Sequence, residues 1–221
     1  MFRVPSINSL QHVLEAAVRI DDAMCGLLFL VGSDGESLHV AAQIDAPGPL
    51  ILHAKTIRAS DGSATGQAAS ERRRVVIRDI ADDPALGAHR GAAESAQVRA
   101  INATPLIDRD RKIRGVLTTF YDAPHHASKI HLALIDRCCQ IAERLIEVVR
   151  LHDAMVHTDR EMGIPERALS PSAAQAADAA RVLLPSISRR PSDEGLLIAT
   201  ERHLAIVADE LSSHLRNRSV S

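Results

Sequence analysis

Apolar residues recur at helical and strand spacings over the first part of the chain. Between Ser9 and Ile20 they stand three and four residues apart, so they share one face of a helix. Two apolar segments of strand length follow, Cys25–Val31 and Ser37–Ile44, joined by a turn that contains Asp34-Gly35. An Asp-Gly pair tolerates the positive φ of a tight hairpin. We therefore expect an amphipathic helix followed by an antiparallel hairpin.

The next stretch, residues 45–74, has weak periodicity. We expect a loop over 59–66 and a short helix over 66–73. The β-branched run that begins at Val75 predicts a third strand reaching Ile80, because proline and acidic turn-formers follow at Asp82-Asp83-Pro84.

A short helix over 86–95 and a second hairpin are predicted next. Its strands are 98–105 and 113–121, on either side of a polar turn. The order of helix, hairpin, short helices, strands and long helix indicates an α+β fold, in which helices pack on an antiparallel sheet.

A long helix is predicted from Ser128 to about Val156. Its apolar positions form two adjacent stripes, one with Leu145 and the other with Ile146, and together they exceed what one sheet face covers. We expect Leu145 to matter more for the fold. We expect Ile146 to face a partner, either the first helix or its copy in a homodimer.

The composition changes after residue 150. We interpret 151–192 as a helical and Ser/Pro-rich linker region and 193–217 as a C-terminal amphipathic helix. Leucines recur there every seven residues, but two heptads are too few for a coiled coil. We therefore expect this helical extension to pack on its own domain.

Composition excludes several classes of partner. The chain is 46% hydrophobic and 24% charged, as is typical of globular proteins. A net charge of −2 provides no field that attracts nucleic acid or an anionic membrane. Aromatic residues make up only 2%, so stacking platforms for nucleic-acid bases are missing. No apolar run approaches the roughly 20 residues that span a bilayer. We expect neither nucleic acid nor membrane as a partner.

Cysteine usage indicates a reducing compartment. The three cysteines, Cys25, Cys138 and Cys139, are too few and too poorly spaced for a disulfide framework. The first residues lack the long apolar stretch and the cleavage site of a signal peptide. We expect a cytoplasmic protein.

Three segments carry a resemblance to a known family. They are Asp61-Gly62-Ser63-Ala64-Thr65-Gly66-Gln67-Ala68 with the arginine-rich strand after it, the run 98–106, and Gly115–Phe120 with Ala123-Pro124-His125. Over about residues 8–150 the chain resembles GAF domains, most of all the GAF sensor domains of bacterial histidine kinases. The resemblance implies a sheet of five or six antiparallel strands, helices on one face for dimerisation, and a ligand pocket under the loops of the other face.

The sequence lacks several features of well-known GAF proteins, which reduces the number of ligands and activities that we expect. The signature of cyclic-nucleotide-binding GAF domains is not visible, and no cysteine lies near 88–97 to attach a bilin. The residues after 150 contain no glycine-rich ATP-binding boxes, so we expect no kinase activity in this chain. The cofactor and the ligand stay unknown.

Six polar residues are candidates for ligand binding. Asp79 and Arg99 flank the third and fourth strands, where they could pair across the pocket mouth and polarise a ligand; a purely structural salt bridge is the alternative. The other four supply donors and acceptors of the kind that orient a ligand in an apolar pocket: His89, Arg90, Asn102 and Thr104.

Other candidate sites are less specific. His125, His126 and His131 lack the Cys, Asp or Glu that would complete a tetrahedral metal site at fixed spacing, so we expect no metal. The basic run Arg72-Arg73-Arg74 is interpreted as a solvated helix end.

The function we expect is non-catalytic. The sequence has no nucleophile elbow, phosphate-binding glycine loop or paired carboxylates. We expect a ligand-sensing homodimer that acts through its long helix on its own tail, a histidine kinase or a response regulator. The alternatives are a thiol enzyme similar to free methionine sulfoxide reductases and a ligand-free dimerisation scaffold.

Overall fold

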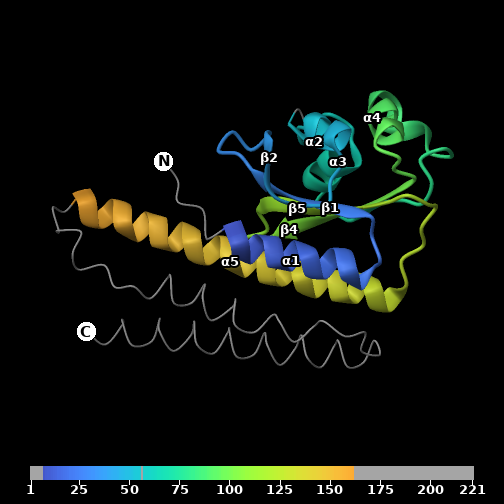
Figure 1. Cartoon of the computed structure of the whole chain (residues 1–221). Coiled ribbons are helices and arrows are strands. Elements are labelled where there is room, and N and C mark those ends of the chain that lie inside the picture. The colour runs from blue at the N-terminus through green and yellow to red at the C-terminus, as the bar shows by residue number, and fades with distance from the viewer. Residues whose placement is uncertain (1–6, 56, 162–221) are drawn as a thin grey trace. The chain divides into compact units, whose positions relative to one another are not determined.

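The computed structural model describes residues 7–55 and 57–161 (Figure 1). Residues 10–148 form one compact unit. The elements, in chain order, are α1 (Ile7–Ile20), β1 (Cys25–Val31), β2 (Leu38–Ile44), α2 (Gly48–Ala54), α3 (Ala64–Glu71), β3 (Val75–Ile77), the 3₁₀ helix η1 (Pro84–His89), α4 (Arg90–Ser95), β4 (Ala100–Ile107), β5 (Ile113–Tyr121) and α5 (Lys129–Glu161).

The strands form one five-stranded antiparallel sheet in the order β2-β1-β5-β4-β3. The two predicted hairpins are adjacent in space, because β1 pairs with β5 in the register Leu28↔Leu117. The expected α+β fold is confirmed. Because side chains alternate along each strand, every strand supplies side chains to both faces.

Each face of the sheet carries its own core. Leu27 and Phe29 of β1 belong to the core that includes residues of α2, α3 and α4, whereas Leu28 belongs to the core that includes residues of α1 and α5. Figure 1 shows α1 and α5 side by side on one face and the short helices over the other. The helices expected on one face are therefore α1 and α5.

Short elements differ from the sequence expectation. Helix α2 was not expected, and α3 begins two residues earlier because Ser63 Oγ accepts a hydrogen bond from Gly66 N–H at the helix N-terminus. Strand β3 ends at Ile77, since Asp79 Oδ1 accepts from Ala81 N–H and turns the chain. The helix expected over 86–95 is divided at Gly87, whose φ is 44°.

The expected roles of Leu145 and Ile146 are reversed. Ile146 is 7% exposed and lies in the same core as Leu10 and Leu14 of α1, whereas Leu145 is only partly buried. Of the two partners considered for this stripe, α1 of the same chain covers it. A helical wheel gives the angle between two stripes but not which of them meets the neighbouring helix.

Polar contacts also fasten α5 to the sheet. Arg74, at the end of the basic run, donates from Nε to Thr104 Oγ1 at 2.9 Å and forms an ion pair with Asp136 of α5. Glu143 of α5 accepts a hydrogen bond from Ile107 N–H at 3.0 Å. Arg74 is therefore a bridge between β4 and α5, and not part of a solvated helix end.

Some sequence predictions fall on other parts of the chain. Residues 162–221, with most of the predicted linker region and all of the C-terminal helix, lie outside the described residues. Within the described helices, none combines the length and the apolar character that a bilayer span requires.

Candidate functional site

A small cavity lies between one face of the sheet and the helices α2, α3 and α4. It has a volume of about 30 Å³. The walls are mostly apolar, and the polar groups that reach it are two imidazoles and two hydroxyls. The lining residues are Leu27, Leu50, His53, Ile57, Ser63, Ala64, Thr65, Leu86, His89, Ala93, Ile101 and Phe120.

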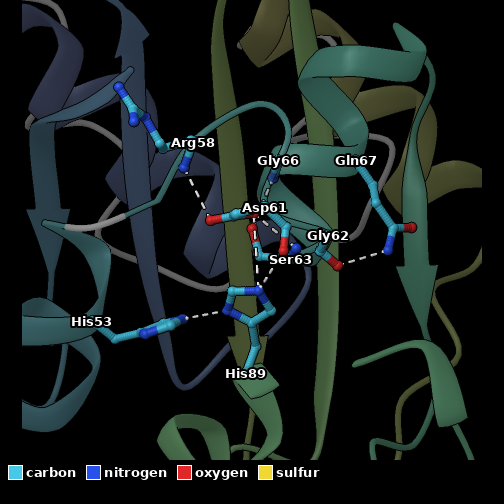
Figure 2. A network of polar contacts seen from close by, with 8 residues as sticks. All are labelled: His53, Arg58, Asp61, Gly62, Ser63, Gly66, Gln67 and His89. Atoms are coloured by element: carbon cyan, nitrogen blue, oxygen red, sulfur yellow. Dashed lines mark hydrogen bonds and ion pairs between the residues drawn. The ribbon is translucent and has the colours of Figure 1, made fainter. Parts of the chain in front are cut away.

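Two histidines from different segments meet at this cavity. Figure 2 shows His53 reaching from α2 toward His89, which ends η1. His53 Nε2 and His89 Nδ1 are 3.0 Å apart, and the ring centroids are 5.0 Å apart at an interplanar angle of 60°. Burial, and then the nearby His89, lower the pKa of His53 below its ordinary value. The neutral imidazole is therefore the form that fits at position 53.

The backbone beyond His89 fixes its tautomer. His89 Nε2 lies 2.8 Å from the carbonyl oxygen of Asp61, and a carbonyl only accepts, so His89 carries its proton on Nε2. In the neutral ring Nδ1 is then an acceptor, and His53 donates to it from Nε2. The Asp61 carboxylate lies farther away, with Oδ1 4.0 Å from His89 Nε2.

The loop that presents Asp61 is fixed by hydrogen bonds (Figure 2). Asp61 Oδ2 accepts from Arg58 N–H at 2.9 Å, and Asp61 Oδ1 accepts from Ser63 N–H at 2.8 Å. The loop crosses Gly66 so closely that a Cβ there would lie 2.3 Å from the carbonyl oxygen of Arg58. The sequence 61–67 therefore forms a preorganised turn that holds the carbonyl of Asp61 over His89.

A buried hydroxyl pair joins this loop to the sheet. Thr65 Oγ1 of α3 lies 3.1 Å from Thr118 Oγ1 of β5, and both side chains are buried. The first turn of α3 is thus tied to the central strand beneath the cavity.

Of the six candidate residues from the sequence, His89 lines the cavity. Arg90, next in the chain, points back and donates to the carbonyl oxygens of Ala81 and Asp83, at 3.3 and 2.7 Å. It holds the loop before η1, and is not among the residues that line the cavity.

Asp79 and Arg99 do pair, but apart from the cavity. Arg99 donates to both carboxylate oxygens of Asp79, at 3.2 and 2.7 Å, and this bond lowers the pKa of Asp79. Neither residue lines the cavity. The pair forms where the segment after β3 meets the start of β4, with Arg99 exposed and Asp79 half-buried. The cavity therefore gives no support for a pair across its mouth, and the choice between a ligand role and a structural salt bridge stays a prediction.

Asn102 and Thr104 point to the opposite face of the sheet. They alternate along β4 with Ile101, which lines the cavity, and Thr104 accepts the bond from Arg74. Asn102 is 2% exposed, and neither atom of its amide forms a hydrogen bond. Strand alternation places both residues in the layer of α1 and α5, so a role in this cavity is excluded.

The residues that sequence reasoning missed come from α2 and α3. His53 lies in a segment whose periodicity is weak, although Pro49 in the first turn of α2 is a helix-start signal. Ser63 and Thr65 lie inside the recognised run 61–68. Their approach to the cavity depends on α3 packing against the sheet, which no local spacing reveals.

A second polar cluster lies under α1 and α5. The Asp21 side chain is fully buried; Tyr121 donates its hydroxyl to Asp21 Oδ2 at 2.6 Å, and His131 Nδ1 lies 2.9 Å from Oδ1. His125 stacks on Tyr121 with ring centroids 3.8 Å apart, and its Nε2 lies 3.1 Å from Asp21 Oδ2 without hydrogen-bond geometry. This cluster joins the end of α1, the end of β5 and the first turn of α5.

The described part of the chain shows no group of metal ligands, and its cysteines are buried. In residues 7–55 and 57–161, no three side chains of His, Cys, Asp or Glu are placed to hold a metal ion. All three cysteines are buried and free. Burial raises the pKa of Cys25 to about 12 and that of Cys138 to about 12, and it also raises that of Cys139.

Comparison with known proteins gives a family and a fold. A family model described as a GAF domain matches residues 9–147. No sequence in the set of curated proteins matches the chain.

Solved structures share the fold at low identity. A domain of a protein assigned as a two-component sensor histidine kinase from Sinorhizobium meliloti has a TM-score of 0.54 and 12% identity, covering 67% of this chain and 94% of that one. The free methionine-R-sulfoxide reductase from Neisseria meningitidis, with its substrate, has a TM-score of 0.52 and 18% identity, covering 66% and 80%. The blue-light-absorbing PixJ GAF domain from Thermosynechococcus elongatus has a TM-score of 0.51 and 14% identity, covering 70% and 90%. These likenesses show the fold alone, because one fold hosts several functions.

Proposed function

Because this chain belongs to the GAF domain family, as the sequence resemblance predicted, we propose that it is a non-catalytic, ligand-sensing regulatory domain of bacterial signal transduction. The cavity is the observation that supports this proposal. An apolar space with a few convergent polar groups is typical of small-molecule sites. Here the walls are aliphatic and aromatic, and the His53–His89 pair is the polar element.

The sheet offers a path from the cavity to α5. Leu27 and Phe120 line the cavity, while their neighbours Leu28 and Tyr121 point to the layer of α1 and α5. Leu27 and Leu28 share the backbone of β1, and Phe120 and Tyr121 share that of β5. A ligand that displaces Leu27 and Phe120 would therefore also displace Leu28 and Tyr121. Binding would shift the populations of alternative α5 packings, which is sufficient for regulation. In this proposal α5 acts in a cytoplasmic homodimer, on a histidine kinase or a response regulator.

The cysteines favour regulation over thiol catalysis. Cys25 belongs to the core on the cavity side of the sheet, whereas Cys138 and Cys139 belong to the core on the α5 side. Catalysis by cooperating thiols requires accessible sulfurs with low pKa, and burial raises the pKa of all three. These positions support a sensor over a free methionine sulfoxide reductase.

Filling the cavity tests the proposal. Ala93→Leu places a larger side chain into the cavity wall, and Ala92→Leu adds the same atoms on the same helix at a position that does not line the cavity. We expect native mass spectrometry, or a thermal-shift screen of small metabolites, to find a molecule that binds the wild type and Ala92→Leu but not Ala93→Leu. Equal binding by both variants would contradict the site. Complete absence of binding would favour the dimerisation scaffold.

A further inference from the structure

Three buried polar atoms on the α1 and α5 side of the sheet form no hydrogen bond with the described residues. They are Nδ2 and Oδ1 of Asn102 and Nε2 of His125. Nearly all buried polar atoms in folded proteins have a protein or water partner, so these three require an explanation. We propose that an internal water molecule binds here and bridges the Asn102 amide to the polar cluster around Tyr121. The inference is independent of the proposed function, because Asn102 lies on the opposite face of the sheet from the cavity.

The sheet register brings Asn102 beside the Tyr121 hydroxyl. Asn102 of β4 is directly opposite Thr119 of β5, and Thr119 Oγ1 lies 2.9 Å from the Tyr121 hydroxyl oxygen. Burial raises the pKa of Tyr121, whereas the Asn102 side chain acts in the opposite direction, which agrees with an amide close to the hydroxyl. No direct hydrogen bond joins that amide to either hydroxyl. A bridge through a third molecule would satisfy it.

The hydroxyl protons beside Asn102 already have acceptors. Tyr121 donates its proton to Asp21 Oδ2 at 2.6 Å. The Thr119 proton has two acceptors within reach, the Tyr121 oxygen at 2.9 Å and the backbone carbonyl oxygen of Asn102 at 3.5 Å. Each hydroxyl has a single proton to donate. The side-chain oxygen of Asn102 therefore needs a donor that these hydroxyls do not supply.

The helices pack apolar side chains closely against this part of the sheet. Gly26 of β1 is paired with Thr119, and a Cβ at Gly26 would lie 2.6 Å from Val18 Cγ2 and 3.0 Å from Leu14 Cδ1. Ile135 of α5 belongs to the same core as these two α1 residues. Apolar groups cannot satisfy a buried amide, and the close packing of α1 favours a small occupant.

Water matches the groups that remain to be satisfied. The Asn102 amide needs both a donor and an acceptor, and a water molecule donates two hydrogen bonds and accepts two. A buried water typically makes about three hydrogen bonds. His125 Nε2, which lies 3.1 Å from Asp21 Oδ2, is the other unsatisfied atom of this cluster. The water links β4 to the contact that holds the first turn of α5, in which His131 Nδ1 lies 2.9 Å from Asp21 Oδ1.

Nuclear magnetic resonance of the full-length wild-type protein tests the site without any substitution. We expect nuclear Overhauser cross-peaks between the Asn102 side-chain amide protons and a long-lived water. A high-resolution crystal structure should show that water about 2.7–3.2 Å from the amide, which separates it from exchanging hydroxyl protons. A dry site, with the amide bonded directly to Thr119 or Tyr121, would overturn the proposal. Density for a larger molecule would also overturn it, because the assigned ligand is water.

Two substitutions on one face of β4 test the role of the amide. Asn102→Leu keeps a similar size without polar atoms, so we expect its crystal structure to lose the water. Thr104→Val is the matched control, because the Thr104 hydroxyl is already bonded to Arg74 Nε, and it should retain the water. A water that persists in Asn102→Leu would overturn the assignment to Asn102. The wild-type measurements decide the proposal even where a variant fails to fold.

Discussion

The Tyr121 hydroxyl donates to Asp21 Oδ2 at 2.6 Å, although the two residues are one hundred positions apart in the sequence. Both side chains are buried, and the bond joins the last residue of β5 to the turn after α1. Burial, and then the bond to Asp21, raise the pKa of Tyr121. The phenol is therefore a fixed donor to a buried carboxylate.

Removing that donor should destabilise the fold. Tyr121→Phe keeps the ring but leaves the carboxylate with one partner fewer, which costs about 1–3 kcal/mol for a buried acceptor. Urea denaturation followed by circular dichroism measures this change. In a double-mutant cycle with Asp21→Asn we expect non-additive changes, because both residues belong to one network. Strict additivity would mean that the two side chains act separately.

The ionisation of Glu143 should make the free energy of unfolding depend on pH, with a sign that follows from the direction of its pKa shift. Burial raises its pKa above the ordinary value, and the bond from Ile107 N–H only partly offsets this effect. Its ionised form is therefore disfavoured by folding: this destabilisation is present above the folded pKa and disappears as the pH falls toward the unfolded value. Glu143→Gln keeps an acceptor oxygen. We expect its free energy of unfolding to equal or exceed that of the wild type at about pH 7, with the difference shrinking toward about pH 4. A less stable variant at neutral pH would contradict this assignment.

The native protein should present three slowly reacting thiols. Cys25, Cys138 and Cys139 are buried, and burial raises the pKa of each above its ordinary value. Titration with a chromogenic disulfide should therefore be slow in buffer and rapid in denaturant. One rapidly reacting thiol in the native protein would revive the thiol-enzyme alternative.

Ile146→Glu should unfold the domain rather than separate a dimer. Ile146 lies in the core with α1, so a charge there would be buried without a partner, at a cost of more than about 3 kcal/mol. Leu145→Glu is the matched comparison, because Leu145 is only partly buried. We expect Leu145→Glu to keep the far-ultraviolet spectrum and to weaken the proposed dimer in light scattering. A folded Ile146→Glu variant would show that this face of α5 is not part of the core.

Gly66→Ala should displace the loop that holds Asp61 in the candidate site. A Cβ at Gly66 would lie 2.3 Å from the carbonyl oxygen of Arg58 and 2.5 Å from Asp61 Oδ1, so the loop that holds Asp61 would have to move. We expect a loss of about 1–3 kcal/mol in stability and a shift of the His89 ring resonances. Gly91→Ala is the control, since no atom lies within 4 Å of a Cβ there.

The sequence alone determined the family, the α+β class and most elements. Strand β5 is found with its exact bounds at 113–121, because seven of its nine residues are apolar or β-branched and clear turn residues stand on either side. Long helices and strands produce a periodic pattern that depends only on neighbours in the chain. Helix α2 was missed because seven residues hold too few periods to form such a pattern.

The tertiary structure decided the site. Asp79 and Arg99 form the ion pair that two opposite charges at strand ends predict, but neither residue lines the cavity. Asn102 and Thr104 lie on the other face of the sheet, because side chains alternate along β4. His89 was predicted, but its partner His53 was not, because 36 residues separate them and only the packing of α2 against η1 brings the rings together. Local periodicity records which side of its own element a residue occupies. Which elements then meet depends on the burial of apolar surface over the whole sheet, which no short segment encodes.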